Sequence, residues 1–401
     1  MIRQLLFATT TLALLAMARP AFSHGQADAE ADPGIPGRAI EFPDTADRLT
    51  LAVDLHTHSV FSDGHVWPRI RVGEAIRDGL DAMAVTEHLE WQPHLADIPH
   101  PDRNRSYEEA RASLPDGAEL ILIAGSEITR QEPIGHMNAV FIQDANTLVH
   151  LPEPTEPYDP RAYAVGAGEW PAADALVAAE RQGAFVFWNH SWWQQPSQIS
   201  TMTDFHRQAI RDGRLHGIEI ANGDVYSPEA FQIALDYGLT PIGVSDVHEL
   251  IDWDYEPYKG GHRPVNLVFA ETRSADAIRD ALFEGRTVVW YRNLLFGRER
   301  DLLPLLEASL VVEGAGWQGD GSVLEVVIVN PSDADFELEN LTVPTPIGSG
   351  ASFVVPAHSR DTYAFRVAER ADSVALRLRV GNAFTAPGTR AELGFNVLPG
   401  T

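Results

Sequence analysis

The stretch LAVDLHTH at residues 51–58 decides how the rest of the chain is interpreted. Its first five residues form a short, mostly apolar run of the kind found in buried strands. His56 and His58 follow this run. Side chains two positions apart on a strand point to the same face, so both imidazoles can reach one metal ion. The stretch therefore predicts a strand with a metal-binding pair at its end.

Outward from this stretch, short apolar runs alternate with helical patterns as far as about residue 306. Helix 68–77, for example, is predicted from Pro68 at its first position, and a second strand is predicted at 82–85. Such alternation favours an α/β fold built on a parallel sheet or barrel, which we place at residues 49–304.

After Pro304 the pattern changes to a period of two residues, as in VALRLRV at 374–380. This pattern predicts a small antiparallel β-sandwich-like domain at residues 305–401. Its clean alternation predicts a core of its own, so a barrel that ends after about Arg300 should still bind metal and hydrolyse a small ester.

The N-terminus has the pattern of a Sec-type signal peptide. Arg3 precedes an apolar stretch at 5–18, and Ala21-Phe22-Ser23 supplies small residues for cleavage after Ser23. A periplasmic or secreted protein is therefore predicted, with residues 24–48 as a disordered or draped lead-in. The apolar stretch is too short to span a bilayer, and no membrane span is predicted elsewhere.

Composition excludes several classes of protein. The chain has 57 acidic against 30 basic residues and a net charge of −27, which disfavours binding to a nucleic acid backbone. It contains no cysteine, which excludes disulfides, cysteine-bound zinc, a cysteine nucleophile and a lipid-anchored lipoprotein.

Histidines and carboxylates gather where the predicted strands end. Each motif alone is weak, but together they lie at the edge where α/β barrels hold their active sites. So many nitrogen and oxygen ligands suit a cluster of Zn, Mn or Fe ions better than one ion. The predicted metal ligands are His56, His58, Asp63, His88, Glu127, His136, His190, Asp246 and His248.

The series His56-x-His58-Ser59, Ser62-Asp63-Gly64, Thr86-Glu87-His88, Gly125-x-Glu127, Gly135-His136, Asn189-His190 and Asp246-x-His248 resembles the PHP (polymerase and histidinol phosphatase) domain across residues 51–300. The resemblance implies a distorted (β/α)7 barrel with three divalent metal ions. It implies His56, His58, Glu127 and Asp246 for the first ion, and Glu127, His136 and His190 for the second. Asp63, His88 and His248 are implied for the third, with His65 as a substitute ligand.

The chemistry expected of such a cluster is phosphate ester hydrolysis. Clustered metals lower the pKa of a bridging water and clamp phosphate oxygens, so a metal-bridged hydroxide would attack phosphorus. Glu127 is best placed to bridge two ions. The expected substrate is a small-molecule phosphate ester, with phosphodiesters favoured over monoesters. A secreted PHP barrel with a β-domain also resembles bacterial secreted phosphodiesterases.

Two other classes of protein stay open. An amidohydrolase-like amide or lactone hydrolase also begins with His-x-His, but many of these bridge their metals with a carbamylated lysine on a middle strand. The only lysine, Lys259, lies after Asp246 and cannot take that place. The second alternative is a non-catalytic metal-binding or adhesive module.

Substrate-binding residues are predicted from their place on loops near the ligands. Arg263 and Arg130 are candidates to hold a phosphoryl oxygen, although a surface ion pair explains each as well. Trp192 and Trp193 could wall a pocket for an apolar or aromatic ester group, although loop packing explains them equally. His65 is predicted, in addition to Glu127, to be a catalytic residue.

Overall fold

The computed structural model describes residues 39–193, 195, 197–348 and 350–400. The predicted signal peptide and residues 24–38 of the lead-in lie outside these ranges. Residues 39–48 drape over the molecule, because Ile40 N donates to Asp78 O and Glu41 N donates to Asp333 Oδ2. Within the described ranges, no helix is both long and apolar enough to cross a membrane.

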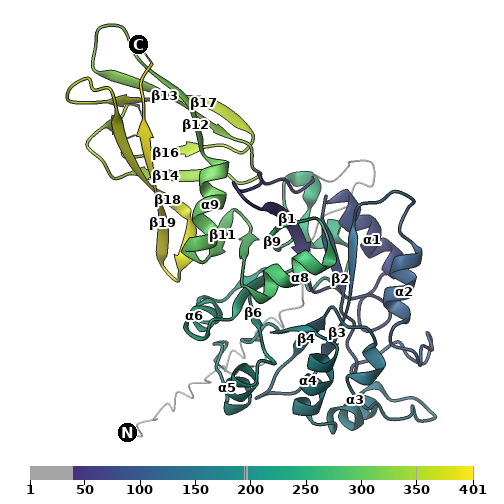
Figure 1. The fold of residues 1–401 in the computed structure, drawn as a ribbon. Helices are drawn as coiled ribbons and strands as arrows, with labels where there is room; N and C mark the ends of the chain where they lie inside the picture. The colour runs from purple at the N-terminus through teal and green to yellow at the C-terminus, as the bar shows by residue number, and fades with distance from the viewer. Residues whose placement is uncertain (1–38, 194, 196, 349, 401) are drawn as a thin grey trace, which may run out of the picture.

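Residues 49–297 form a curled sheet with helices packed on its outside, which we call the barrel (Figure 1). β1, β2 and β3 are parallel, as are β5, β6 and β8, whereas β4, β9 and β10 pair antiparallel with their neighbours. The strands are β1 (Leu49–Asp54), β2 (Ala82–Val85), β3 (Ile121–Ile128), β4 (Met137–Val140), β5 (Phe185–Trp188), β6 (Gly217–Asn222), β7 (Val225–Tyr226), β8 (Thr240–Val244), β9 (Val265–Ala270), β10 (Thr287–Tyr291) and β11 (Leu294–Gly297).

The sheet closes on itself just beyond the ends of β1 and β8. Thr57 and Val247 form a parallel bridge, and Asp246 N donates to His56 O over 2.9 Å. Inside the barrel the strands are buried on both faces, which explains their nearly continuous apolar sequences. The closure brings the ends of the first and last parallel strands together.

Helices connect the strands and begin and end at the signals in the sequence. At α6, the Ser227 side chain accepts from Ala230 N, Pro228 takes the first position, and Gly238 ends the helix at φ +71°. The helices are α1 (Pro68–Arg77), α2 (Arg105–Ala112), α3 (Pro160–Gly168), α4 (Ala172–Arg181), α5 (Asp204–Arg211), α6 (Pro228–Tyr237), α7 (Ile251–Tyr255), α8 (Ala275–Phe283) and α9 (Glu299–Ser309), with short 3-10 turns at Ala145–Thr147 and Pro257–Lys259.

Residues 311–397 form a β-sandwich whose two antiparallel sheets face each other. One sheet contains β12 (Val311–Trp317), β13 (Val323–Asn330), β15 (Thr345–Pro346) and β17 (Ser359–Arg366). The other contains β14 (Phe336–Asn340), β16 (Ser352–Val355), β18 (Val374–Ala386) and β19 (Thr389–Val397). The predicted α/β fold with a C-terminal antiparallel β-domain is confirmed.

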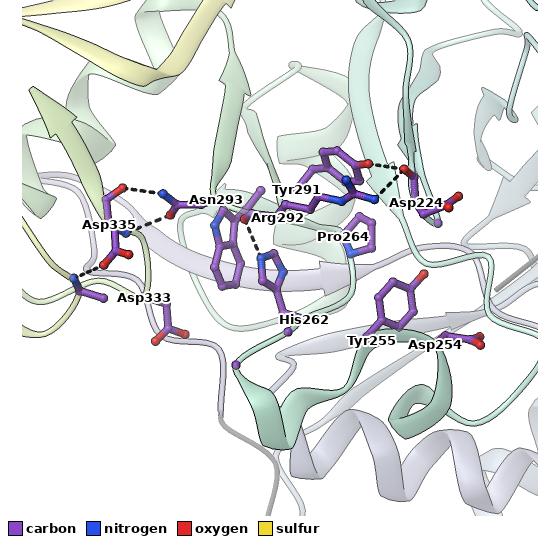
Figure 2. Close-up of a pocket in the computed structure, with 15 residues that line it drawn as sticks. Asp224, Asp254, Tyr255, His262, Pro264, Tyr291, Arg292, Asn293, Asp333 and Asp335 are labelled. Carbon is purple, nitrogen blue, oxygen red and sulfur yellow. Dashed lines mark hydrogen bonds between the residues drawn. The ribbon is translucent and has the colours of Figure 1, made fainter. Parts of the chain in front are cut away.

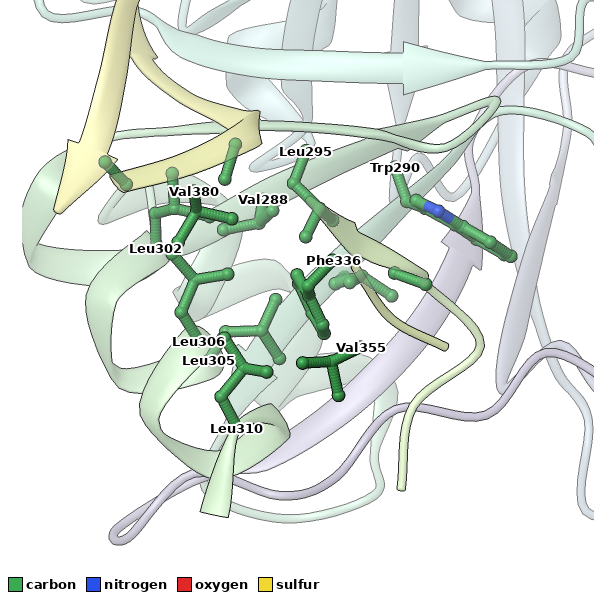
Figure 3. Packing of buried hydrophobic residues seen from close by; sticks show 14 of the residues in the cluster. Val288, Trp290, Leu295, Leu302, Leu305, Leu306, Leu310, Phe336, Val355 and Val380 are labelled. Carbon is green, nitrogen blue, oxygen red and sulfur yellow. The ribbon is translucent and has the colours of Figure 1, made fainter. Parts of the chain in front are cut away.

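The core of the β-sandwich is continuous with that of the barrel, which corrects the expectation of a separate core. β18 pairs in parallel with β11, so one sheet runs through both halves. Figure 3 shows α9 between them, with Leu302 and Leu305 packed among barrel and sandwich side chains such as Val288 and Phe336. The predicted boundary at residues 304/305 stays a prediction, and α9 runs through it.

Candidate metal centre

The residues predicted as metal ligands lie together at one edge of the barrel. His56, His88 and Asp246 lie two or three residues beyond the ends of parallel strands, whereas His136 immediately precedes β4. Because β4 is antiparallel to β3 and β5, its start lies at the same edge as their ends. The change in strand direction therefore explains the one motif that comes before its strand.

The first group consists of four ligand atoms that face one another. The Nε2 atoms of His56 and His58 lie 2.9 Å apart, and each is 3.3 Å from Glu127 Oε2. Asp246 Oδ1 lies 3.2 Å from His56 Nε2 and 3.0 Å from His58 Nε2. Around an ion held tetrahedrally at about 2.0 Å, ligand atoms lie about 3.3 Å apart. The spacing therefore fits a divalent ion between these four atoms.

Charge in the first group also fits a cation. Burial lowers the pKa of His56, but the carboxylates of Asp246, Glu127 and Glu219 outweigh burial and raise the pKa well above its ordinary value. Burial raises the pKa of Asp246, yet the adjacent imidazoles hold that pKa well below its ordinary value. The carboxylates therefore stay ionised, and a divalent cation is the natural partner for their buried charge.

The second group gathers around the other oxygen of Glu127. His136 Nδ1 lies 2.9 Å from Glu127 Oε1, and His190 Nε2 lies 3.6 Å from the same oxygen. Burial lowers the pKa of His136 to about 4, so this imidazole is neutral, the form that binds metal. Its Nε2 atom is buried and has no hydrogen-bond partner. Two imidazoles beside one carboxylate oxygen make a second candidate ion position.

The third group surrounds Asp63. Its Oδ1 atom lies 3.1 Å from His248 Nε2 and 3.5 Å from His88 Nε2. The ring of His58 stacks between this group and the first, with centroids 4.6 Å from His88 and 4.4 Å from His248. Ligand atoms of these four residues all lie within 4.8 Å of one another. The structure therefore places the predicted third set together, next to the first.

Glu127 connects the groups. Its side chain is fully buried, and its two oxygens face different histidines. Oε2 faces His56 and His58, whereas Oε1 faces His136 and His190. Asn189 Nδ2 also donates to Oε1 over 2.9 Å, which fixes the plane of the carboxylate. This is the geometry that a bridging carboxylate requires.

Two of the ligand-bearing residues have strained backbones. Asp246 has φ +50° and His190 has φ +22°, a region that non-glycine residues occupy at a cost of about 1–3 kcal/mol. Hydrogen bonds hold both in place, from Asp246 N to His56 O and from His190 N to Glu219 Oε2. Such strain is typical of functional sites, because it turns a side chain toward a shared centre.

Sequence reasoning missed the residues that orient the ligands. His56 Nδ1 lies 2.7 Å from Glu219 Oε1, and His88 Nδ1 lies 2.7 Å from Thr129 Oγ1. His58 Nδ1 lies 3.2 Å from Ser62 Oγ, which in turn bonds to Glu87. A buried charge inside an otherwise apolar strand is a signal that could have revealed Glu219.

The two predicted substrate arginines are engaged elsewhere. Arg263 is fully buried and pairs with Asp54 at 3.2 Å and Asp78 at 2.7 Å. Arg130 is buried against Glu90 and also donates to Trp170 O. Both guanidinium groups are thus occupied by structural ion pairs, which corrects the predicted contact with a phosphoryl oxygen.

The two tryptophans that follow His190 differ in their exposure to solvent. Trp192 is buried, as the packing explanation requires, whereas its neighbour Trp193 is 42% exposed. The Trp193 ring stands edge-on to His190 and His136, at centroid distances of 5.3 and 5.7 Å. Of the two tryptophans, Trp193 therefore lies exposed beside the ligands, whereas Trp192 packs in the interior.

His65 lies outside the three groups. Its side chain is 56% exposed, and its Nδ1 atom lies 2.5 Å from Glu249 Oε1. Its backbone N donates to His248 O, which keeps it beside the third group. His65 thus stands at the surface next to the ligands, and its predicted part in catalysis stays a prediction.

A cleft of about 440 Å³ lies between the barrel and the β-sandwich. Figure 2 shows that its polar side chains are largely bonded to the protein itself: Asn293 pairs with the backbone of Asp335, and His262 contacts the carbonyl of Arg292. Tyr255 reaches from its wall to Ser245 O, next to the first group. The internal bonding indicates a junction between the two halves.

Comparison with known proteins agrees with this geometry. A two-domain protein of Bacteroides vulgatus ATCC 8482, containing a predicted PHP-like metal-dependent phosphoesterase, is 36% identical over 90% of this chain and 99% of that chain, with a TM-score of 0.79. Residues 310–396 match the sequence model of an Ig-like domain family. No curated protein matches the chain.

Two further solved structures are less similar. One, assigned as a metal-dependent phosphoesterase of Bifidobacterium adolescentis ATCC 15703, is 22% identical over 58% of this chain and 96% of that chain, with a TM-score of 0.39. The other, an amidohydrolase from Chromobacterium violaceum, is 18% identical over 52% and 90%, with a TM-score of 0.35. The similarity to the Bacteroides protein is much greater, because it extends over both the barrel and the β-sandwich of this chain. The chain therefore belongs to the family of PHP-like metal-dependent phosphoesterases.

Proposed function

We propose that this hydrolase is a secreted phosphodiesterase with a trinuclear metal centre. The observation that carries the proposal is the joining of three ligand groups through Glu127 and His58. The first ion would be held by His56, His58, Glu127 and Asp246, and the second by Glu127, His136 and His190. The third would be held by Asp63, His88 and His248.

The chain's own residues prepare this centre for phosphoester chemistry. Divalent ions bound at such a cluster lower the pKa of water and clamp phosphate oxygens. Burial keeps the carboxylates of Glu127 and Asp246 away from bulk water, which strengthens their attraction for cations. Contacts such as that between His88 and Thr129 fix how each imidazole ring faces the centre.

The preference for diesters is supported by the charges around the site. A monoester dianion carries about two negative charges near neutral pH, whereas a diester carries one, so the dianion needs more cationic partners. Arg130 and Arg263, the two arginines considered as phosphate ligands, both form ion pairs with carboxylates of the protein. Trp193, exposed beside His190, offers an apolar surface for a second ester group.

Secretion is supported by the sequence of the first 23 residues, which lie outside the described part of the chain. The amidohydrolase alternative gains nothing from the position of Lys259. This residue lies on an exposed 3-10 turn and pairs with Glu256 over 2.8 Å, so it does not bridge ligands.

A panel of phosphate mono-, di- and triesters tests the proposed reaction. The purified, metal-supplemented protein is expected to hydrolyse diesters with the highest kcat/KM, and Glu127→Ala should abolish that activity in the same assay. Faster turnover of monoesters would overturn the diester preference. Failure to hydrolyse any of the esters would overturn the proposed function itself.

Metal content is expected to approach about three ions per chain, because each of the three sets would supply at least three ligands. Elemental analysis after supplementation and desalting measures it, and His88→Ala should lower the value by about one ion. His358→Ala, which alters a histidine of the β-sandwich, is the matched control and should leave the content unchanged. A reproducible value of about one ion in the unaltered protein would contradict the cluster.

A further inference from the structure

Glu219 is a fully buried carboxylate in the middle of β6, among apolar neighbours. A buried charge of this kind is costly unless it is hydrogen-bonded or paired. Its contacts all lead to the metal centre: Oε1 lies 2.7 Å from His56 Nδ1, and Oε2 accepts from His190 N over 2.6 Å. Oε2 also accepts from Asn222 Nδ2 over 2.9 Å. One carboxylate therefore touches two residues that bear ligands.

A β-bulge makes this arrangement possible. Residues three apart on a regular strand point to opposite faces, so Glu219 and Asn222 would be separated. In β6 the pairing with β8 shifts between Glu219 and Ala221, which leaves Ile220 as an extra residue. Asn222 consequently lies on the same face as Glu219, and it also donates to Asp246 Oδ2 over 3.0 Å.

The contacts at the two oxygens of Glu219 determine which nitrogen of His56 carries the shared hydrogen. An ionised carboxylate only accepts hydrogen bonds, and Oε2 is already occupied by two N–H donors. The short contact at Oε1 therefore requires His56 to donate from Nδ1. Because Nδ1 keeps its hydrogen, Nε2 is the nitrogen that offers a lone pair when a cation binds, and this atom faces His58 Nε2, Glu127 Oε2 and Asp246 Oδ1.

We propose that Glu219 is a positioning residue that fixes the metal-binding tautomer of His56 and, through Asn222, the orientation of Asp246. The inference rests on the proposed metal centre and identifies what prepares its first position. Partners of this kind are worth about 10–100-fold in metal affinity.

Glu219→Gln is the sharpest test, because it keeps the size and shape of the side chain but reverses the direction of the hydrogen bond to His56. The two N–H donors at Oε2 hold the amide oxygen there, so the amide NH2 group faces His56. His56 must then accept at Nδ1 and carry its hydrogen on Nε2, the atom that faces the ion position. Metal affinity at that position is expected to fall by about 10–100-fold. Glu219→Asp, which retains a carboxylate, should restore part of it.

Two measurements that do not depend on turnover decide the matter. In zinc-loaded protein labelled with 15N-histidine, long-range 1H–15N spectra should show His56 protonated on Nδ1 alone in the unaltered protein and on Nε2 in Glu219→Gln. The His56 signals are assigned by their loss in His56→Asn. Competitive titration with a chelating dye then gives the metal affinity of each folded variant. Asp301→Asn, which alters a buried carboxylate on α9, is the matched control and should leave both readouts unchanged.

An Nε2-protonated His56 in the unaltered, zinc-loaded protein would overturn the proposal, even if no Glu219 variant folds. Wild-type metal affinity in folded Glu219→Gln would overturn it as well. Both outcomes are independent of the proposed reaction. A protein with the expected tautomer and metal load that hydrolyses no phosphate ester would contradict the function and leave the role of Glu219 intact.

Discussion

Replacement of Glu127 by alanine is expected to reduce turnover by more than about a thousandfold, a loss of about 4 kcal/mol of transition-state stabilisation. The physical reason is that its two oxygens serve two different groups of histidines, so one substitution removes a ligand from two ion positions. Steady-state kinetics with an activated diester, together with elemental analysis, measures the effect. Metal content should fall along with turnover.

The fold should survive this substitution, because Glu127 is surrounded by polar side chains rather than by the apolar core. Circular dichroism and thermal unfolding check this point. Glu313→Ala, at an exposed ion pair with Arg360 in the β-sandwich, should behave like the unaltered protein. Near-normal turnover in folded Glu127→Ala would remove Glu127 from the centre.

The shared core reverses the expectation drawn from the sequence for a shortened chain, and a chain that ends after Arg300 is expected to yield no folded protein. It lacks Leu302, Leu305 and Leu306, which are fully buried against the barrel side chains shown in Figure 3. Loss of one buried leucine side chain costs about 2–5 kcal/mol. Three of them approach or exceed the total stability of a typical domain, about 5–15 kcal/mol. Soluble yield and thermal unfolding of the truncated chain are the measurements.

Single substitutions separate packing from chemistry in this region. Leu305→Ala should lower the free energy of unfolding by about 2–5 kcal/mol and leave metal content unchanged. Leu398→Ala, at a side chain that is 68% exposed, should have little effect. A truncated barrel that is stable and loaded with metal would contradict this picture and show that the β-sandwich is a separable unit.

Local patterns in the sequence predicted much of the fold. Helix 68–77 was predicted from Pro68 and coincides with α1, because the signal for its start lies in its own first turn. The antiparallel direction of β4 was not predicted, because direction depends on which strands lie beside it. The shared core around α9 was missed for the same reason, since alternation in a strand does not reveal what covers each face.

By itself, the sequence determined which residue types gather at the strand ends and their resemblance to a metal-dependent phosphoesterase. Ligand residues are recognisable because each follows or precedes a strand within a short motif, as His56 and Asp246 do. Only the tertiary structure decided that Arg263 pairs with buried carboxylates, that Trp193 rather than Trp192 is exposed, and that Glu219 holds His56. These contacts join residues far apart in the chain, and their energies depend on burial and on distances of a few ångström, which no local pattern encodes.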